Sequence, residues 1–333
     1  MKIQLTHTFE DVIAIENLLS AWREFRVGKS KRKDVQQFER NLMDHILTLH
    51  GHLVNKTYSH GGYHSFIITD PKVRHIHKAS VQDRLVHHAI VRKLYPFFDR
   101  TFIADSYSCR IGKGTQKARD RFRAMMCKVS QNNTKHCWVL KCDIRKFFAS
   151  VDHGILLSIL RQYIPDKDIL WLLTNVISSF SLANNQKGMP LGNLTSQLFS
   201  NIYMNQFDQW MKHKLKAKYY IRYADDFVFL SCSKIQLEER LPKVQSFLQE
   251  QLQLSLHPNK IHLQNLSSGV DFLGWKLFVD HRILRTVTKR RALRRISENP
   301  KNETLQSYLG MLQHGNARKI RGEVFGRYWV GRN

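Results

Sequence analysis

The pattern of polar and apolar positions points first to a hairpin with an acidic tip. Residues 218–222 and 227–231 alternate as β-strands do, and Tyr223-Ala224-Asp225-Asp226 lies between them, so a β-hairpin is predicted. Tight hairpin turns usually carry Asn-Gly or Asp-Gly, because their central residues need positive φ. Two adjacent carboxylates in this place repel each other unless a cation lies between them. A solvated acidic turn is the plainer alternative, and a third carboxylate elsewhere in the chain argues against it.

That third carboxylate ends a second predicted strand. Residues 137–143 form an apolar run that closes on Asp143, followed by Phe147-Phe148 and a helix capped by Asp152. We therefore expect Asp143, Asp225 and Asp226 to meet on one edge of a sheet. Three carboxylates that hold two Mg²⁺ ions are what in-line nucleotidyl transfer requires.

The first eighty residues change from helical to strand-like spacing. Apolar residues predict helices at 11–22 and 38–53, separated by a basic loop. The following stretch predicts a hairpin that presents Lys72 and Arg74 on one face, where two cations suit a triphosphate.

The remaining patterns are mostly helical. A helix is predicted at residues 82–94, and a second begins after Gly112 in a segment that resembles an anion cradle without the spacing of a P-loop. A basic helical tail begins at Arg285, and such a tail suits a nucleic-acid duplex.

Charge strengthens the interpretation as a nucleic-acid enzyme. The 333 residues include 53 Lys and Arg against 27 Asp and Glu, a net charge of +26, which polyphosphate would balance.

No apolar run approaches the ~20 residues that span a membrane, and no signal peptide is recognised, so we expect a cytoplasmic protein with no membrane partner. The five cysteines form no C-x-x-C pair, which favours free thiols. The seventeen histidines lack recognisable metal-ligand spacing.

Five motifs in order resemble the palm series of reverse transcriptases. They are Asp143 with an aromatic residue five positions on, Gly188 to Gln197, Tyr223 to Asp226, Asn259-Lys260, and Asp271-Phe-Leu-Gly-Trp275. The word Leu191-Gly192-Asn193-Leu194-Thr195-Ser196-Gln197 looks like the hallmark of reverse transcriptases from diversity-generating retroelements. Group II intron and retroviral enzymes carry Gln where Leu191 stands and Pro where Gln197 stands.

The resemblance implies roles for individual residues. The implied catalytic residues are Asp143, Asp225, Asp226 and Lys260, and the implied ligands of two Mg²⁺ ions are Asp143, Ile144, Asp225 and Asp226. Lys260 would donate a proton to the leaving pyrophosphate; a surface lysine is its alternative. The dNTP contacts implied are Lys72, Arg74, Phe148, Leu191 and Gly192. Phe148 would be the aromatic gate that excludes a ribose 2′-hydroxyl; a core aromatic is its alternative. Template or primer contacts are Arg110, Asn193, Gln197, Tyr223 and the primer grip Phe272, Leu273 and Gly274.

The fold class implied is an α/β right-hand polymerase, with fingers, a palm with an antiparallel sheet, and a helical thumb. We expect an N-terminal helical extension at 1–60, fingers at 61–135, the palm with part of the fingers at 136–284, and the thumb at 285–333. We expect no RNase H, endonuclease or integrase in this chain.

The function implied is error-prone synthesis of cDNA, mutagenised at adenines, in a bacterial or phage-encoded diversity-generating retroelement. The implied partners are a template-repeat RNA, the cDNA/RNA duplex, dNTPs, and an accessory variability protein that forms a helical, oligomeric ring. Three alternatives remain: a group II intron-type enzyme, a phage-defence reverse transcriptase, and a non-catalytic RNA-binding scaffold.

Overall fold

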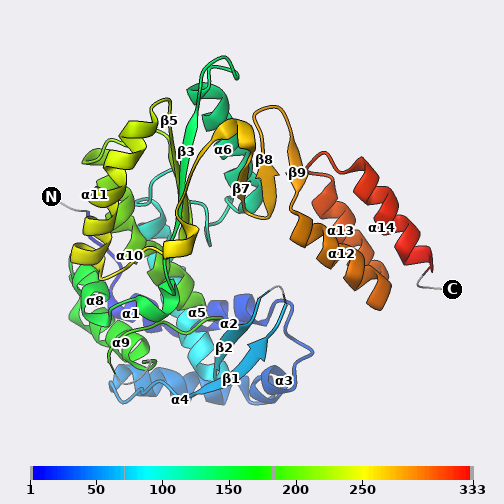
Figure 1. The fold of residues 1–333 in the computed structure, drawn as a ribbon. Helices are drawn as coiled ribbons and strands as arrows, with labels where there is room; N and C mark the ends of the chain where they lie inside the picture. Colours follow the sequence, from blue (N-terminus) through cyan, green and yellow to red (C-terminus); the bar gives the residue numbers. More distant parts are fainter. Residues whose placement is uncertain (1–2, 71, 182–184, 331–333) are drawn as a thin grey trace. The chain divides into compact units, whose positions relative to one another are not determined.

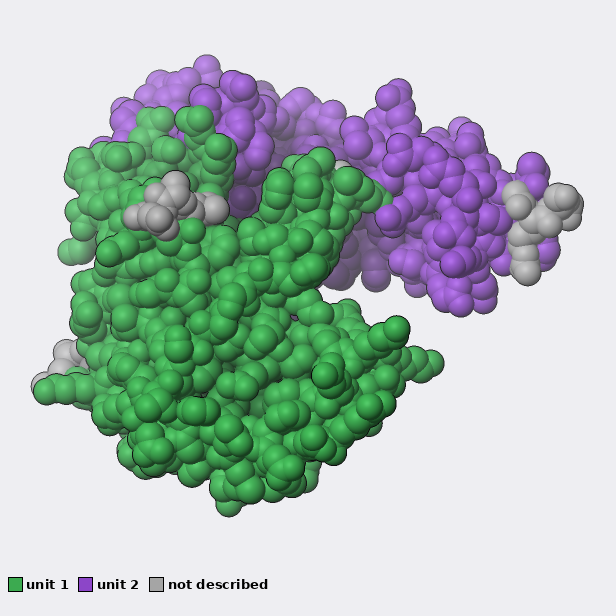
Figure 2. Space-filling model, turned by 90° about the horizontal axis from the view of Figure 1, so that it is seen from below, with its two compact units in different colours: residues 1–104, 144–214, 244–255 green, residues 105–143, 215–243, 256–333 purple. Residues whose placement is uncertain are grey.

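The chain forms two compact units, each assembled from three separate segments (Figure 2). Unit 1 comprises residues 1–104, 144–214 and 244–255, and unit 2 comprises residues 105–143, 215–243 and 256–333. The computed structural model describes residues 3–70, 72–181 and 185–330. Within these residues, no helix has both the length and the apolar character needed to cross a membrane.

Unit 1 is mainly helical, with one two-stranded sheet (Figure 1). Its elements are α1 (Phe9–Ile13), α2 (Ile15–Arg26), α3 (Lys33–Arg40), α4 (Leu42–Val54), β1 (Tyr63–Ile68), β2 (Arg74–Ala79), α5 (Val81–Asp99), α7 (Phe147–Ser150), α8 (His153–Arg161), α9 (Lys167–Ser178) and α10 (Leu194–His213). Helix α5 packs against both α2 and α10. Helix α11 (Lys234–Leu252) begins in unit 2 and ends in unit 1.

The two predicted N-terminal helices are present, each preceded by a further helix. The Thr8 hydroxyl caps α1 by accepting a hydrogen bond from the Asp11 amide. Ala14, at φ −46° and ψ 137°, then separates α1 from α2. Asn41, at φ −119° and ψ 44°, separates α3 from α4 in the same way. Apolar periodicity continues across both breaks, which is why spacing alone did not reveal them.

The predicted hairpin after residue 60 is confirmed, but its second strand begins later than expected. Strands β1 and β2 pair antiparallel, with Ile68 opposite Arg74. Arg74 is therefore the first residue of β2, and Lys72 lies outside the strand. Both cations are exposed. The sequence analysis expected Lys72 and Arg74 on one face of the same strand. Because β2 begins at Arg74, strand alternation does not place Lys72 on that face.

Unit 2 contains two antiparallel sheets and the C-terminal helices. Its elements are α6 (Thr115–Val129), β3 (Trp138–Asp143), β4 (Tyr220–Tyr223), β5 (Asp226–Ser231), η1 (Pro258–Lys260), β6 (His262–Asn265), η2 (Leu266–Ser268), β7 (Val270–Phe272), β8 (Trp275–Leu277), β9 (Arg282–Leu284), α12 (Thr286–Glu298), α13 (Asn302–Leu312) and α14 (Arg318–Val330). The larger sheet has the strand order β4-β5-β3-β6, and the smaller has β7-β8-β9. Figure 1 shows α12, α13 and α14 side by side, in agreement with their mutual contacts.

One apolar cluster joins both sheets of unit 2 to its helices. Phe122 of α6, Val228 of β5, Trp275 of β8 and Ile296 of α12 all belong to it, and each is 1% exposed or less. Gly315 approaches this cluster so closely that an added Cβ would lie 2.0 Å from the Trp275 ring. The loop between α13 and α14 therefore requires glycine at position 315.

Candidate active site

The register of the larger sheet in unit 2 places two of the predicted carboxylates opposite each other. Strands β3 and β5 pair antiparallel over six residues, and Asp143 is the partner of Asp226. Directly opposite residues project from the same face of an antiparallel pair. Apolar residues along both strands, such as Val139, Leu140 and Phe229, are buried, so the two carboxylates lie at the end of a strand pair that packs in the core of unit 2.

Asp225 lies in the two-residue turn that joins β4 to β5. Tyr223 pairs with Asp226, so Ala224 and Asp225 form the turn, and Ala224 adopts φ +55°. A non-glycine residue in this conformation needs support from its surroundings. Arg222 provides it: this side chain is fully buried, and Nη1 donates to the Ala224 carbonyl oxygen at 3.0 Å.

A second interaction of Arg222 ties the turn to the segment before α6. Nη2 of Arg222 donates to the Ser106 hydroxyl at 3.0 Å. The backbone amide of Tyr107 donates to the Arg222 carbonyl, and the Arg222 amide donates to the Asp105 carbonyl. Residues 105–107 therefore extend the edge of the sheet beside β4. A charged residue within the apolar strand β4 is the sequence signal for this role, and the sequence analysis did not use it.

Two lysines neutralise the opposed carboxylates. Lys260 donates from Nζ to Oδ1 of Asp143 at 2.7 Å. Nζ of Lys141 lies 3.2 Å from Oδ2 of Asp226 and donates to the Asp271 carbonyl at 2.7 Å. Lys260 thus lies beside Asp143, and its proposed role as a proton donor stays a prediction; Lys141 was not anticipated. Lys141 is recognisable in retrospect, because it interrupts the apolar run of β3.

Burial raises the pKa of the Asp226 carboxyl to about 6; the charge of Lys141 opposes this shift, and Asp143 and Asp225 add to it. Oδ1 of Asp226 is buried and has no hydrogen-bond partner in the described structure. A buried carboxylate oxygen without a partner, next to other carboxylates, fits a hard divalent cation. The residues that the structure describes nevertheless include no group of three or more His, Cys, Asp or Glu arranged to hold a metal ion.

Unit 1 brings the predicted dNTP-contacting loop and hairpin together. The Leu191 carbonyl accepts a hydrogen bond from the His77 amide at 3.1 Å, and the Asn193 side chain donates to the His77 carbonyl at 3.0 Å. Gly192 has φ +107°, and a Cβ there would lie 3.0 Å from Ile76. Residues 191–193 therefore lie against β2, the strand that carries Arg74.

The side chains of this segment differ in their exposure. Asn193 is 2% exposed, so its amide serves the contact with β2, and its predicted contact with template or primer stays a prediction. Gln197 is exposed on the first turn of α10. Leu198, Ile202 and Phe207 of the same helix are buried.

Phe148 is more exposed than its neighbour Phe147. Phe147 is 2% exposed, whereas Phe148 is only partly buried. Their rings meet edge to face, with centroids 5.4 Å apart, and the Phe148 carbonyl accepts from the Met189 amide at 2.7 Å. Part of the Phe148 ring is accessible to a ligand. Ile144, four residues before Phe148 and predicted to bind metal, is buried.

The predicted primer grip lies between β7 and β8 in unit 2. Phe272 is fully buried against Phe122, which leaves Leu273 and Gly274, with φ of +50° and +86°, as the accessible residues. Nη1 of Arg119 donates to the Leu273 carbonyl at 3.3 Å, so this arginine supports the turn. Sequence spacing gave no indication of that contact.

Two further predicted contacts lie elsewhere in unit 2. Arg110 donates from Nη1 to the Ser106 carbonyl at 3.0 Å, in the segment that borders β4. Tyr223 is partly buried, and burial raises the pKa of its hydroxyl.

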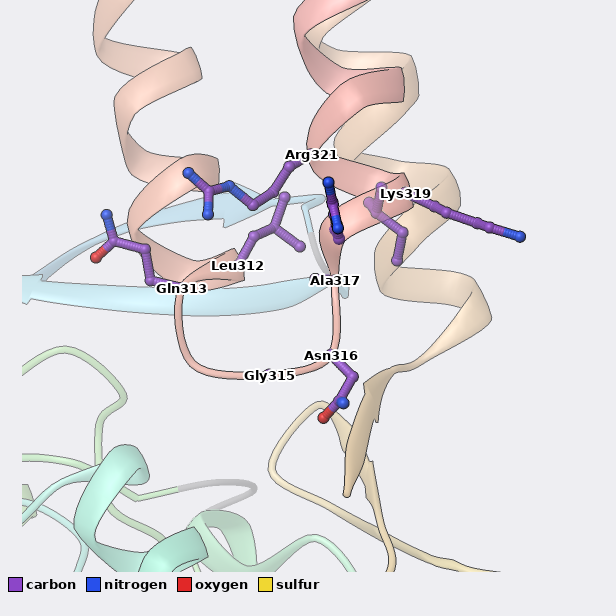
Figure 3. A pocket seen from close by; sticks show the side chains of 9 residues that line it. Leu312, Gln313, Gly315, Asn316, Ala317, Lys319 and Arg321 are labelled. Carbon is purple, nitrogen blue, oxygen red and sulfur yellow. The ribbon is translucent and has the colours of Figure 1, made fainter. Parts of the chain in front are cut away.

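A basic pocket lies in the loop that joins α13 to α14 (Figure 3). Its lining includes Gly315 and Asn316 in the loop, and Lys319 and Arg321 on the first turn of α14. Figure 3 shows the Lys319 and Arg321 side chains leaving the helix in different directions. Cationic side chains beside a helix N-terminus suit phosphate groups, which agrees with the predicted duplex-binding role of this tail.

The site belongs to a chain that matches a known family over most of its length. Residues 69–277 match the family model described as reverse transcriptase (RNA-dependent DNA polymerase). The chain is 25% identical over 271 residues to Protein YkfC of Escherichia coli (strain K12), an alignment that covers 70% of this chain and 68% of that protein.

Two other relatives are named for introns, and this chain spans only a small part of each. It is 22% identical over 211 residues to the putative COX1/OXI3 intron 2 protein of Saccharomyces cerevisiae, covering 45% of this chain and 25% of that protein. It is 26% identical over 92 residues to nuclear intron maturase 1, mitochondrial, of Arabidopsis thaliana, covering 28% of this chain and 12% of that protein.

A solved structure supports the same fold. Apo telomerase from Candida tropicalis, truncated from the C-terminal domain, matches with a TM-score of 0.50 and 13% identity, covering 73% of this chain and 60% of that chain. The predicted fold class, a right-hand polymerase with an antiparallel sheet and helices, is confirmed. With the family model matched across residues 69–277, this chain belongs to the reverse transcriptase (RNA-dependent DNA polymerase) family.

Proposed function

We propose that this protein copies an RNA template into DNA by nucleotidyl transfer at Asp143, Asp225 and Asp226. The observation that carries the proposal is the pairing of Asp143 with Asp226 across β3 and β5, with Asp225 in the adjoining turn. A decayed scaffold that only binds RNA would have no need to keep these carboxylates next to one another at the cost of their mutual repulsion.

Each proposed role follows from the chemistry of the side chain. Asp143, Asp225 and Asp226, with the backbone of Ile144, would hold two Mg²⁺ ions, which supply activation of the primer 3′-hydroxyl and charge neutralisation at the triphosphate. Lys260, already 2.7 Å from Asp143, would donate a proton to the leaving pyrophosphate. Lys72 and Arg74 would bind the triphosphate.

The proposed division of labour follows the right-hand polymerase. Residues 61–135 would form the fingers, 136–284 the palm with part of the fingers, and 285–333 the thumb, after an N-terminal extension at 1–60. The basic pocket between α13 and α14 supports a duplex-binding thumb, because Lys319 and Arg321 suit backbone phosphates.

We further propose that the product is the mutagenised cDNA of a diversity-generating retroelement. Support comes from Leu191, whose side chain can make no hydrogen bond to a nascent base pair, where accurate relatives have Gln. One such bond is typically worth ~0.5 to 1.5 kcal/mol. Its loss relaxes selection most where the pair is weakest, opposite template adenine. A template-repeat RNA and a ring-forming accessory variability protein are the partners proposed with this function.

Sequencing of cDNA tests this proposal. Wild type and Leu191→Gln would copy one RNA of balanced composition, and the errors would be counted at each template base. We expect the wild type to misincorporate mainly opposite adenine, and Leu191→Gln to lower those errors by up to about tenfold. Errors spread evenly over the four bases in the wild type would contradict the retroelement assignment and leave reverse transcription intact.

A group II intron-type enzyme is the second candidate, because two relatives carry intron names. Such a protein would assist splicing of an intron RNA as well as copy it. Incubation with a group II intron RNA at low Mg²⁺ distinguishes the two candidates, since splicing stimulated by this protein favours the second.

A further inference from the structure

A pocket of mixed polar and apolar lining in unit 1 lies outside every site assigned above. It has a volume of about 580 Å³ and is formed by α3, α4, the two strands of the hairpin and the start of α5. Its lining includes Gln37, Phe38, His45, His64 and Gln82. This size falls within the range of pockets that hold a nucleotide-sized ligand.

A column of stacked rings ends in the wall of this pocket. Trp22 and Phe38 are stacked with their centroids 5.1 Å apart, and Phe38 and His45 are stacked at 4.4 Å. Trp22 is 3% exposed and Phe38 is 8% exposed, whereas His45 is only partly buried. The column therefore starts in the core of unit 1 and reaches solvent at the His45 ring.

The His45 ring is held in one orientation. Its Nδ1 lies 2.9 Å from the Phe38 carbonyl oxygen. Because a carbonyl can only accept, Nδ1 carries the hydrogen in this contact. No second ring contact is recorded for His45 in the described part of the chain. A planar ligand that stacks on the outer face of this imidazole would extend the column.

The charges around the pocket favour a nucleic acid. Asp34 at the pocket wall is paired with both Lys78 at 2.6 Å and Arg84 at 2.7 Å, so this group of three side chains carries a net positive charge. Lys31, Arg32 and Lys33, immediately before and at the start of α3, are all exposed. An aromatic stacking surface beside cations is the combination by which proteins bind single strands.

We propose that this pocket binds an unpaired base of single-stranded RNA, stacked on His45, with the adjacent phosphates on Lys31, Arg32 and Lys33. Gln37 and Gln82 line the pocket with amides that can contact the edge of the base. The inference rests on the proposed function, because it assumes that RNA is the ligand of this chain. It adds a contact to the RNA that is independent of the catalytic carboxylates and of the predicted dNTP contacts.

The test measures the affinity for a fluorescein-labelled 12-nucleotide oligo(A) RNA by anisotropy, for wild type, His45→Ala and His45→Phe. We expect His45→Ala to weaken binding roughly 5- to 150-fold, the range that corresponds to one stacked base. His45→Phe keeps an aromatic face and should bind like the wild type. Leu47→Ala, an exposed residue on the same helix, is the matched control and should also bind like the wild type.

An RNA of equal length with abasic riboses separates stacking from charge. On this ligand we expect wild type and His45→Ala to bind equally, because the base that His45 contacts is absent. Equal affinity of the two proteins for oligo(A), or an equal loss on both RNAs, would overturn the proposal. Equal affinity for oligo(A) is also the outcome expected if a protein partner occupies the pocket.

Primer extension by the same proteins keeps this result distinct from the proposed function. On a short primer-template at saturating concentration, Leu47→Ala should extend the primer as the wild type does. A wild-type protein that extends no primer on RNA would refute the proposed function itself, whatever the anisotropy shows.

Discussion

The buried side chain of Arg222 donates a hydrogen bond from Nη1 to the carbonyl oxygen of Ala224. Ala224 lies in the turn that carries Asp225. The guanidinium thus contacts the backbone of the turn one residue before Asp225. It holds a left-handed Ala224 in place, so the position of Asp225 depends on a residue that needs no contact with substrate.

Replacement of Arg222 by Met should lower kcat with little change in the KM for dNTP. The Ala224 carbonyl would lose its partner, at a cost of about 1 to 3 kcal/mol, and Asp225 would lose its fixed position. We expect kcat to fall roughly 5- to 150-fold, as measured by steady-state primer extension. Arg222→Lys, which keeps the charge and one donor, should lose less. A folded Arg222→Met enzyme with wild-type kcat would show that the turn keeps its conformation without the Arg222 hydrogen bond.

Asp143→Asn or Asp225→Asn should abolish synthesis while leaving the affinity for RNA nearly unchanged. An amide cannot supply the negative charge that metal-assisted transfer needs. Metal ions stabilise the charge of the transition state by several kcal/mol, so a loss of about 10³-fold or more in kcat is expected. Affinity comes from Lys and Arg and is measured separately by filter binding. Activity that persists in either variant at millimolar Mg²⁺ would contradict the assignment of these carboxylates.

Lys260→Met should lower kcat and raise the apparent affinity for Mg²⁺ at the same time. The lysine is the proposed proton donor, worth about 10²- to 10⁴-fold, and it also neutralises Asp143 at 2.7 Å. Without the lysine, Asp143 has no competing cation in this contact, so half-maximal activity should need less Mg²⁺. A Mg²⁺ titration of wild type and variant measures both effects. An increased Mg²⁺ requirement in Lys260→Met would show that the lysine does not compete with the metal.

Phe148→Ala should admit ribonucleotides while still using deoxyribonucleotides. Its ring is partly accessible, and its removal makes room for a 2′-hydroxyl. We expect the preference for dNTP over rNTP to fall by roughly 10- to 200-fold, the range by which an apolar pocket discriminates on one small substituent of a substrate. The measurement compares kcat/KM for dCTP and CTP, and Phe148→Tyr should keep the wild-type preference. An unchanged preference in folded Phe148→Ala would assign Phe148 to the core.

The free energy of unfolding should fall as the pH is lowered from 7.5 to 5, in part because His88 is buried. Burial, followed by the charges of Lys29, Arg84 and Arg92, lowers the pKa of His88 to about 4 from 6.5. Burial also lowers the pKa of His87 well below 6.5. Between pH 6.5 and 4 the unfolded chain therefore binds more protons than the folded protein, and stability rises with pH in this window.

Replacement of His88 by Leu should reduce this dependence on pH. Nδ1 of His88 has no hydrogen-bond partner in the described structure, so Leu sacrifices no bond. The readout is the difference in Tm between pH 7.5 and pH 5, with His136→Leu at an exposed position as the control. If the Tm of His88→Leu and of His136→Leu depends on pH as the Tm of the wild type does, His88 is not responsible for the pH dependence of stability.

The local elements of the site were predictable because they depend on neighbours in sequence. Alternation in residues 218–231 identified the β4–β5 hairpin, and the Asp152 side chain does cap α8, accepting from the Ile155 amide. Buried charges were not predictable in the same way. The Arg222 and Lys141 contacts join residues that are up to 130 positions apart, and an isolated cation within an apolar strand is consistent with either a surface or a buried position.

The interleaving of the two units has a consequence for synthesis on the ribosome. Unit 1 needs residues 244–255 to be complete, and β3 must wait for β5 in unit 2. The 151 residues from 105 to 255 take roughly 8 to 30 s to translate at ~5 to 20 residues per second. During this interval the first 104 residues lack their remaining partners in unit 1 and leave apolar surface exposed. Nascent chains of this protein should therefore depend on chaperones, and a gene divided at any unit boundary up to residue 243 should yield no half that folds alone.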